Sequence, residues 1–216
     1  MTPAPNYFYP NRMGRIILLA MEEILGHSGL NAALHLSQLP DYINNYPPHT
    51  QDLCFPFEHV SRLQTSLEKA YGPRAGRGLA LRIGRACFKY GLREFGPELG
   101  LTDLKFRLLP IPAKLMAGSE AFAYLFNNFT DQRVRLERDE KNIYWHIERC
   151  PLCWDRQMET VELSQANGPC CHLAVGLLQE ALYWVSGGKY FQVEEKSCIA
   201  CGDSMCTIVI DQHPMS

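Results

Sequence analysis

Apolar residues recur at spacings of three and four through the first 129 residues, which predicts a mainly helical region. The helical segments are expected at residues 12–25, 29–39, 56–71, 74–95 and 113–129. Gly26 follows the first segment directly, as glycine commonly does just past the end of a helix. The first ten residues hold three prolines and three aromatic residues, so we expect an irregular arm there.

The pattern changes after residue 130, where apolar and polar residues alternate. Residues 134–138 and 143–149 flank a polar turn and predict a β-hairpin. A helical pattern follows at 170–185, and two further strands are expected at 191–196 and 205–210. The chain therefore predicts an α+β fold, with an antiparallel sheet of about four strands packed against several helices. We expect one domain over 1–216, with a mainly helical part (1–129) and a strand–helix–strand part (130–212).

The composition is that of an ordinary globular protein, with 46% hydrophobic and 20% charged residues. The net charge of −2 and the pI near 6.4 argue against nucleic acid as the main partner. No apolar run approaches the ~20 residues that a membrane-spanning helix needs. No signal-peptide pattern is visible at the start, so we expect a cytoplasmic protein without a membrane span.

Cysteine is unusually frequent, with nine residues, of which seven lie between Cys150 and Cys206. An odd count without an export signal makes a disulfide framework a poor explanation. Clustered thiolates with a nearby carboxylate are instead the ligands that bind zinc, usually in a closed tetrahedron. Cys54 and Cys87 stand among apolar neighbours, and we expect both to be buried as small hydrophobic residues.

Spacing alone leaves several interpretations of this cysteine-rich segment open. One ligand set is a pair of C-x-x-C motifs, Cys150, Cys153, Cys198 and Cys201, on which an iron–sulfur cluster is a further alternative. The other set is Cys171, Glu195, Cys198 and Cys206. The cysteines could also simply be buried without a metal.

The motif Cys171…Gly176, Glu195-x-x-Cys198 and Gly202-Asp203-x-x-Cys206 resembles that of the 4-vinyl-reductase domain family. In layout the chain is most similar to the family's bacteriochlorophyll-synthesis J proteins. It is more distantly similar to the phenol-sensing domains of bacterial activators and to small TRAPP subunits. The resemblance implies a TRAPP-like fold. It also implies a zinc ion held by Cys171, Glu195, Cys198 and Cys206, and a homodimer, since such relatives commonly pair.

A reductase needs a redox donor, but the glycines between Gly72 and Gly78 fit neither the dinucleotide fingerprint nor the P-loop. Catalysis is therefore doubtful, and a binding role is favoured. The expected cavity-lining residues are Trp145, Phe122, Phe126 and Phe88, although such aromatic residues are often plain core. Because side chains alternate along a strand, Trp145 should face the cavity and its two neighbours should face away.

The function that this interpretation favours is binding of a chlorophyllide-type tetrapyrrole, as an accessory or carrier protein in bacteriochlorophyll biosynthesis. Enzymes of that synthesis would be its partners. Arg85, Lys89 and Arg93 could then meet a propionate, and His146 or His172 could ligate a central magnesium. One alternative is a sensor domain for small aromatic ligands. The other is a catalytic divinyl-chlorophyllide vinyl reductase.

Overall fold

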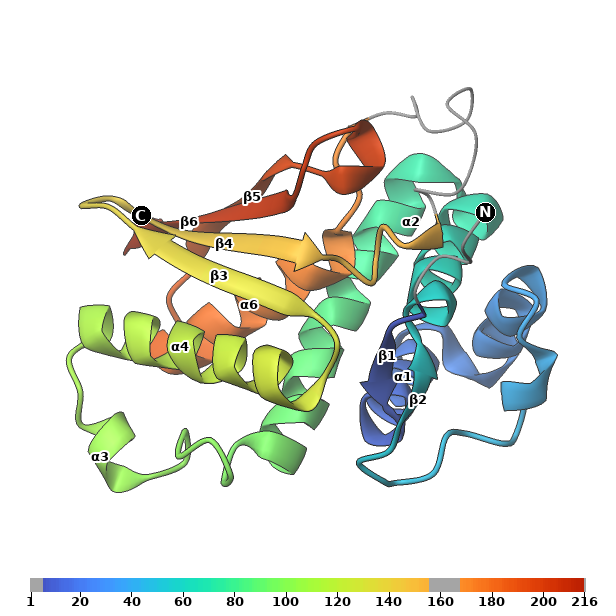
Figure 1. The fold of residues 1–216 in the computed structure, drawn as a ribbon, viewed down its shortest axis with the longest axis horizontal. Coiled ribbons are helices and arrows are strands. Elements are labelled where there is room, and N and C mark those ends of the chain that lie inside the picture. The colour runs from blue at the N-terminus through green and yellow to red at the C-terminus, as the bar shows by residue number, and fades with distance from the viewer. Residues whose placement is uncertain (1–5, 156–167, 216) are drawn as a thin grey trace.

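A computed structural model describes residues 6–155 and 168–215, and shows helices packed on an antiparallel sheet (Figure 1). The sheet has four strands in the order β3-β4-β6-β5, and all neighbouring pairs are antiparallel. The elements are β1 (Phe8–Pro10), α1 (Asn11–Leu36), β2 (Leu53–Pro56), α2 (Phe57–Phe95), α3 (Leu104–Arg107), α4 (Ile111–Phe129), β3 (Arg133–Arg138), β4 (Asn142–Arg149), α6 (His172–Ser186), β5 (Phe191–Ser197) and β6 (Cys206–Pro214), with short 3-10 turns at Pro40–Tyr42 and Ile199–Cys201. The α+β prediction is thus confirmed.

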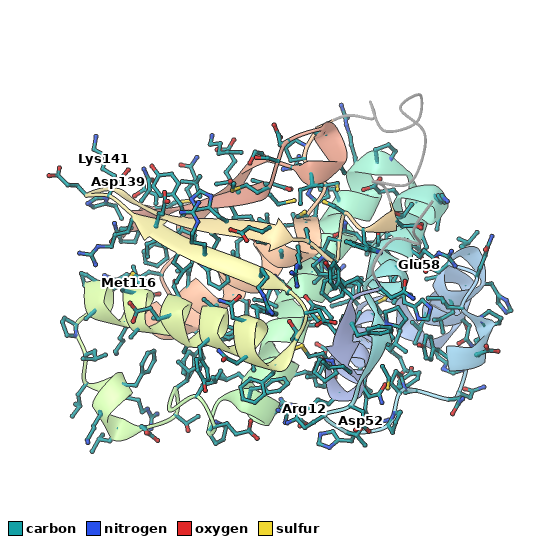
Figure 2. All side chains as sticks on the ribbon, viewed as in Figure 1. Arg12, Asp52, Glu58, Met116, Asp139 and Lys141 are labelled. Atoms are coloured by element: carbon teal, nitrogen blue, oxygen red, sulfur yellow. The ribbon has the colours of Figure 1, made fainter. Side chains whose placement is uncertain are left out.

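Two glycines bend the long helices where the sequence pattern predicted separate ones. Gly26 interrupts α1 with φ 72°, and Gly72 interrupts α2 with φ 78°. Glycine adopts positive φ without the steric penalty of a Cβ atom, so each helical run continues in a new direction. Arg12 lies on the part of α1 that precedes this bend (Figure 2). The central carbon of its guanidinium lies 3.9 Å from the centroid of the Phe95 ring.

The start of the chain differs from the expected irregular arm. Phe8–Pro10 forms β1, which pairs with β2 in a two-stranded antiparallel sheet beside α1. This pairing joins residues far apart in sequence, which a local pattern does not reveal. It places the ring of Tyr9 in the core, where the side chain is 7% exposed.

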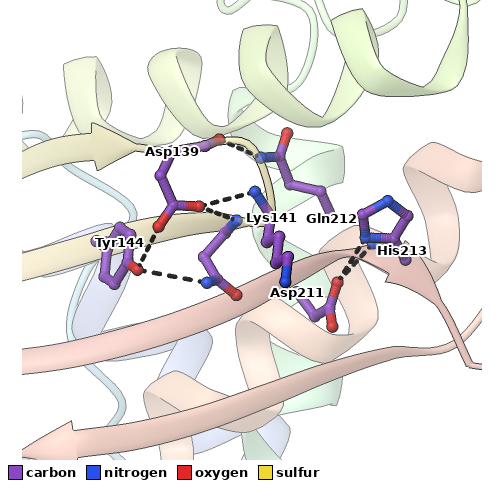
Figure 3. A network of polar contacts seen from close by, with 7 residues as sticks. Asp139, Lys141, Tyr144, Asp211, Gln212 and His213 are labelled. Atoms are coloured by element: carbon purple, nitrogen blue, oxygen red, sulfur yellow. Dashed lines mark hydrogen bonds and ion pairs between the residues drawn. The ribbon is translucent and has the colours of Figure 1, made fainter.

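The tip of the β3–β4 hairpin is held by a network around Asp139 (Figure 3). Its Oδ1 accepts hydrogen bonds from the amides of Lys141 and Asn142, each at 2.7 Å, and its Oδ2 accepts one from the Tyr144 hydroxyl. The hydrogen bond from Tyr144, followed by those from the two amides, lowers the pKa of Asp139 to about 2. Gln212 of β6 donates to the Asp139 carbonyl, which ties the hairpin to the next strand.

Strand β4 alternates as the sequence predicted. Trp145 is 2% exposed and faces the helices, together with the buried Ile143 and Ile147. Tyr144 and His146 lie on the opposite face, where their rings stack with centroids 6.1 Å apart. Within the described ranges, no helix is long and apolar enough to span a membrane.

Candidate functional site

A cavity of about 100 Å³ lies among α1, α2, α4, α6 and the inner face of the sheet. Nearly all of its wall is apolar. The four residues expected to bind a ligand, Phe88, Phe122, Phe126 and Trp145, all line it. The rings of Phe88 and Phe122 lie 5.7 Å apart and form one wall of aromatic carbon.

Few polar atoms reach this cavity. The buried indole Nε1 of Trp145 has no hydrogen-bond partner among the residues that the structure describes. The hydroxyl of Tyr9 is already engaged, because it donates a hydrogen bond to Oε1 of Gln132. Cys87 also lines the wall, and burial raises the pKa of its thiol to about 12, so it stays neutral. An indole N–H that is buried without a partner carries a desolvation cost, which a ligand with an acceptor atom could relieve.

Sequence analysis missed several lining residues. Tyr9 and Gln132 come from segments 123 residues apart, and only the β1–β2 pairing brings Tyr9 to the cavity. The segment after β4 contributes Cys150, Pro151 and Leu152, which had been considered only as part of a metal motif. No local pattern in the sequence signals either contribution.

The cations and histidines expected around a tetrapyrrole lie elsewhere. Arg85 donates to Gln179 of α6 at 2.8 Å, and neither Arg85 nor Lys89 nor Arg93 lines the cavity. His146 points to the outer face of the sheet, and its Nδ1 lies 3.1 Å from Oγ1 of Thr207. His172 is also absent from the described cavity wall. The predicted contacts with a propionate and with a central magnesium are therefore not formed there.

The second candidate site is a group of buried cysteines at one end of the sheet. It joins the end of β4, the start of α6, the end of β5 and the start of β6. Six cysteines take part and none is more than 3% exposed: Cys150, Cys153, Cys170, Cys171, Cys198 and Cys206. Their Sγ atoms lie 3.4 to 3.8 Å apart in the closest pairs. We call these six residues the thiol cluster.

The predicted ligand set of Cys171, Glu195, Cys198 and Cys206 comes together, with its ligand atoms all within 4.8 Å of one another. One oxygen of Glu195 accepts the amide of Cys171 at 2.7 Å, whereas Oε1 has no partner among the described residues. Burial, with the electrostatic effect of Cys198 as a second cause, raises the pKa of Glu195 to about 8. The geometry places these four residues together, but it does not by itself select them over other combinations.

The alternative pair of C-x-x-C motifs does not assemble as a set of four. Cys201 is exposed and belongs to none of the convergent groups among the described residues. Cys171 and Cys206 lie beside Cys150 and Cys153 instead. The two isolated cysteines also differ, because Cys87 is buried as predicted whereas Cys54 is exposed, which corrects that part of the prediction.

Comparison with known proteins gives matches in structure alone. No protein-family model matches the chain, and no curated protein matches it. The H-NOX protein of S. oneidensis in its Fe(II)NO state superposes with a TM-score of 0.59 at 12% identity, over 94% of this chain and 99% of the other. A structure described as probing heme distortion in the H-NOX family gives 0.56 at 13% identity, over 95% of each chain. At these identities the likeness shows a shared H-NOX-like fold and nothing finer.

Two further structures match this chain with lower TM-scores. An oxygen-binding H-NOX domain related to soluble guanylate cyclases gives a TM-score of 0.51 at 15% identity, over 92% of this chain and 93% of the other. The phenol-responsive sensory domain of the activator PoxR, solved with phenol, gives 0.48 at 21% identity, over 70% and 72%.

These findings correct the expected family. The neighbours reported above are H-NOX domains and one phenol-sensing domain, and no 4-vinyl reductase or bacteriochlorophyll-synthesis protein appears among them. The TRAPP-like label is not supported either. A role in bacteriochlorophyll synthesis, with partners from that pathway, rested on the resemblance and loses its support with it.

The prediction of zinc as the cofactor is also wrong, because the family resemblance behind it is not supported. The prediction depended on the resemblance, whereas two of the neighbouring H-NOX structures concern heme, one its distortion and the other its redox potential. The thiol cluster remains as a fact of geometry: soft ligand atoms converge, and no ion is identified by that alone.

Proposed function

We propose that this chain is a sensor domain for a small aromatic molecule that carries one hydrogen-bond acceptor, such as a phenol. The observation that carries the proposal is the buried, unpartnered Nε1 of Trp145, a residue that lines this almost wholly apolar cavity. Aromatic walls would hold the ring, and the indole N–H would donate to the ligand oxygen. This combination of an apolar pocket and one or two placed polar groups is typical of small-molecule sites.

The size of the cavity supports a one-ring ligand over a macrocycle. At about 100 Å³ it is of the same order as the roughly 150 Å³ engineered cavity that holds benzene in another protein. Pockets for drug-sized ligands measure roughly 300–1,000 Å³, and a tetrapyrrole lies at the large end of that class. A chlorophyllide-type ligand would therefore require α4 or α2 to move away from the sheet.

Heme, which the fold relatives suggest, requires residues that this cavity does not offer. An iron porphyrin takes a histidine, cysteinate, methionine or tyrosinate as its axial ligand. No described lining residue is a histidine, and none is a lysine or arginine that could pair with the propionates. Burial keeps the thiol of Cys87 neutral, and the hydroxyl of Tyr9 is bonded to Gln132. Cys150 belongs to the thiol cluster, so Met13 is the one remaining described wall residue of a type that ligates heme iron. Without a histidine and without a cation for the propionates, the described wall fits heme poorly.

Three expectations stay predictions. They are a single domain over 1–216, a homodimer, and metal ligation by Cys171, Glu195, Cys198 and Cys206. None of them is needed for the binding proposal, which depends on the cavity alone.

Calorimetric titration with phenol and with benzene tests the proposal. Trp145→Phe should weaken phenol binding by roughly 2- to 13-fold, because it removes one hydrogen bond of about 0.5–1.5 kcal/mol. Benzene has no oxygen to accept that bond, so its affinity should change less. Trp154→Phe is the matched control, since Trp154 packs on Tyr7 and Phe57 outside the cavity wall.

Two results would overturn the proposal. One is the absence of saturable phenol binding to a folded protein. The other is equal loss of phenol and benzene affinity in Trp145→Phe, because the indole would then only fill space. Stoichiometric heme binding with a shifted absorption band would instead show that the cavity opens to a macrocycle.

A further inference from the structure

Two members of the thiol cluster hold a special position. The Sγ of Cys153 lies 3.4 Å from those of Cys171 and Cys206, 3.5 Å from that of Cys198 and 3.8 Å from that of Cys170. The Sγ of Cys171 lies 3.4 Å from that of Cys150 and 3.6 Å from that of Cys206. Cys153 and Cys171 are thus the centre of the cluster, and the other four sulfurs surround them.

Two of the three convergent groups among the described residues repeat this pattern, and the third joins Cys171, Glu195, Cys198 and Cys206. One group of four is Cys150, Cys153, Cys171 and Cys206, and a second is Cys153, Cys170, Cys171 and Cys198. These two groups share two members, Cys153 and Cys171, and together they use all six sulfurs of the thiol cluster. Two tetrahedra that share an edge have this composition: two shared corners, and two further corners on each side.

We propose that the thiol cluster binds two soft, thiolate-preferring divalent cations, with the sulfurs of Cys153 and Cys171 bridging them. Cys150 and Cys206 complete the coordination of one ion, and Cys170 and Cys198 complete that of the other. Each thiol gives up its proton to solvent as it binds. This assigns a role to Cys150, Cys153 and Cys170, which a single ion at Cys171, Glu195, Cys198 and Cys206 leaves without one.

The spacing of the sulfurs agrees with metal coordination. A tetrahedral centre with metal–sulfur bonds of about 2.3 Å places its sulfurs about 3.8 Å apart. The closest pairs, at 3.4 to 3.8 Å, lie at or slightly below that value. An iron–sulfur cluster contains its own inorganic sulfides, which would push the cysteine sulfurs further apart than these contacts allow.

Two backbone features favour a thiolate at particular positions of the cluster. Cys171 stands at the N-cap of α6, whose dipole favours a thiolate there. The amide of Ile199 points at the Sγ of Cys206 from 3.3 Å. Six thiolates on two divalent ions leave a net charge of −2 at the site.

Native mass spectrometry of the reduced full chain after addition of cadmium(II) tests the proposal. We expect two ions per chain, together with cadmium–thiolate absorption in the ultraviolet. The double variant Cys150→Ser with Cys206→Ser should keep one ion, and so should Cys170→Ser with Cys198→Ser. Cys201→Ser, at the exposed cysteine nearby, should keep two.

Two results would overturn the proposal of two bound ions. One ion per chain in the unmodified protein, lost in Glu195→Gln and kept in Cys150→Ser with Cys170→Ser, would overturn the proposal in favour of a single site. No cadmium bound after exchange against a weak chelator would also overturn it. The stoichiometry of the unmodified chain decides the matter even where a double variant fails to fold. Retention of both ions by Glu195→Gln supports the proposal.

Discussion

The crossing of α2 and α6 offers a sharp test of how the cavity is built. Gly84 of α2 and Gly176 of α6 lie where the two helix backbones meet. A Cβ atom at Gly84 would lie 2.0 Å from the carbonyl oxygen of Leu173, and one at Gly176 would lie 2.1 Å from that of Leu81. Each glycine therefore allows the other helix to approach, and Leu173 beside this contact lines the cavity.

Gly84→Ala should destabilise the protein. The new Cβ must move from 2.0 Å to at least 3.0 Å from the oxygen, so the helices must separate by about 1 Å. The obstacle is backbone, which cannot rotate away, so we expect a cost near the top of the usual range, about 3 kcal/mol. Alanine has a higher helix propensity than glycine, which offsets about 1 kcal/mol, so the free energy of unfolding should fall by about 2 kcal/mol. For a chain of this size that lowers Tm by about 4–8 °C.

Urea and thermal unfolding of four variants would measure this: Gly84→Ala, Gly176→Ala, the two combined, and Gly78→Ala. Gly78→Ala is the matched control, because Gly78 lies in the same helix, is exposed and has nothing within 4 Å of an added Cβ. It should gain up to about 1 kcal/mol. Gly84→Ala with Gly176→Ala should cost less than the sum of the single variants, since one separation relieves both contacts. Equal stability of Gly84→Ala and Gly78→Ala would refute the reasoning.

Two further predictions concern hydrogen bonds. Tyr9→Phe leaves Oε1 of the buried Gln132 without its donor, and should lower the free energy of unfolding by about 1–3 kcal/mol. Adding Gln132→Leu should recover part of this loss, measured by urea unfolding. No recovery would contradict the hydrogen bond between Tyr9 and Gln132. The pKa of Asp139 is held at about 2, below its usual 3.8, so its contribution is present above pH 3.8 and is lost as the pH falls through about 2. NMR shifts of the Lys141 and Asn142 amides should therefore titrate near pH 2, and a midpoint near 3.8 would show that the hairpin network does not form.

The sequence by itself determined the local elements. Periodic apolar residues predicted the helices, and Gly26 marked the bend in α1 that the structure shows. Alternation along β4 separated Trp145 from Tyr144 and His146, which lie on opposite faces of the sheet. These features follow from the 3.6- and 2-residue periods of backbone geometry, which a few neighbouring residues express.

Only the tertiary structure decided which distant residues meet. The hydrogen bond between Tyr9 and Gln132 joins positions 123 residues apart. The sequence also could not show that Cys170 enters the thiol cluster while Cys201 stays at the surface. Motif spacing pointed to a family that the structural neighbours do not support, although four residues of the motif, Cys171, Glu195, Cys198 and Cys206, do converge in space. The cavity and the thiol cluster both depend on strands and helices brought together from across the chain, and that arrangement is fixed by packing of the whole core.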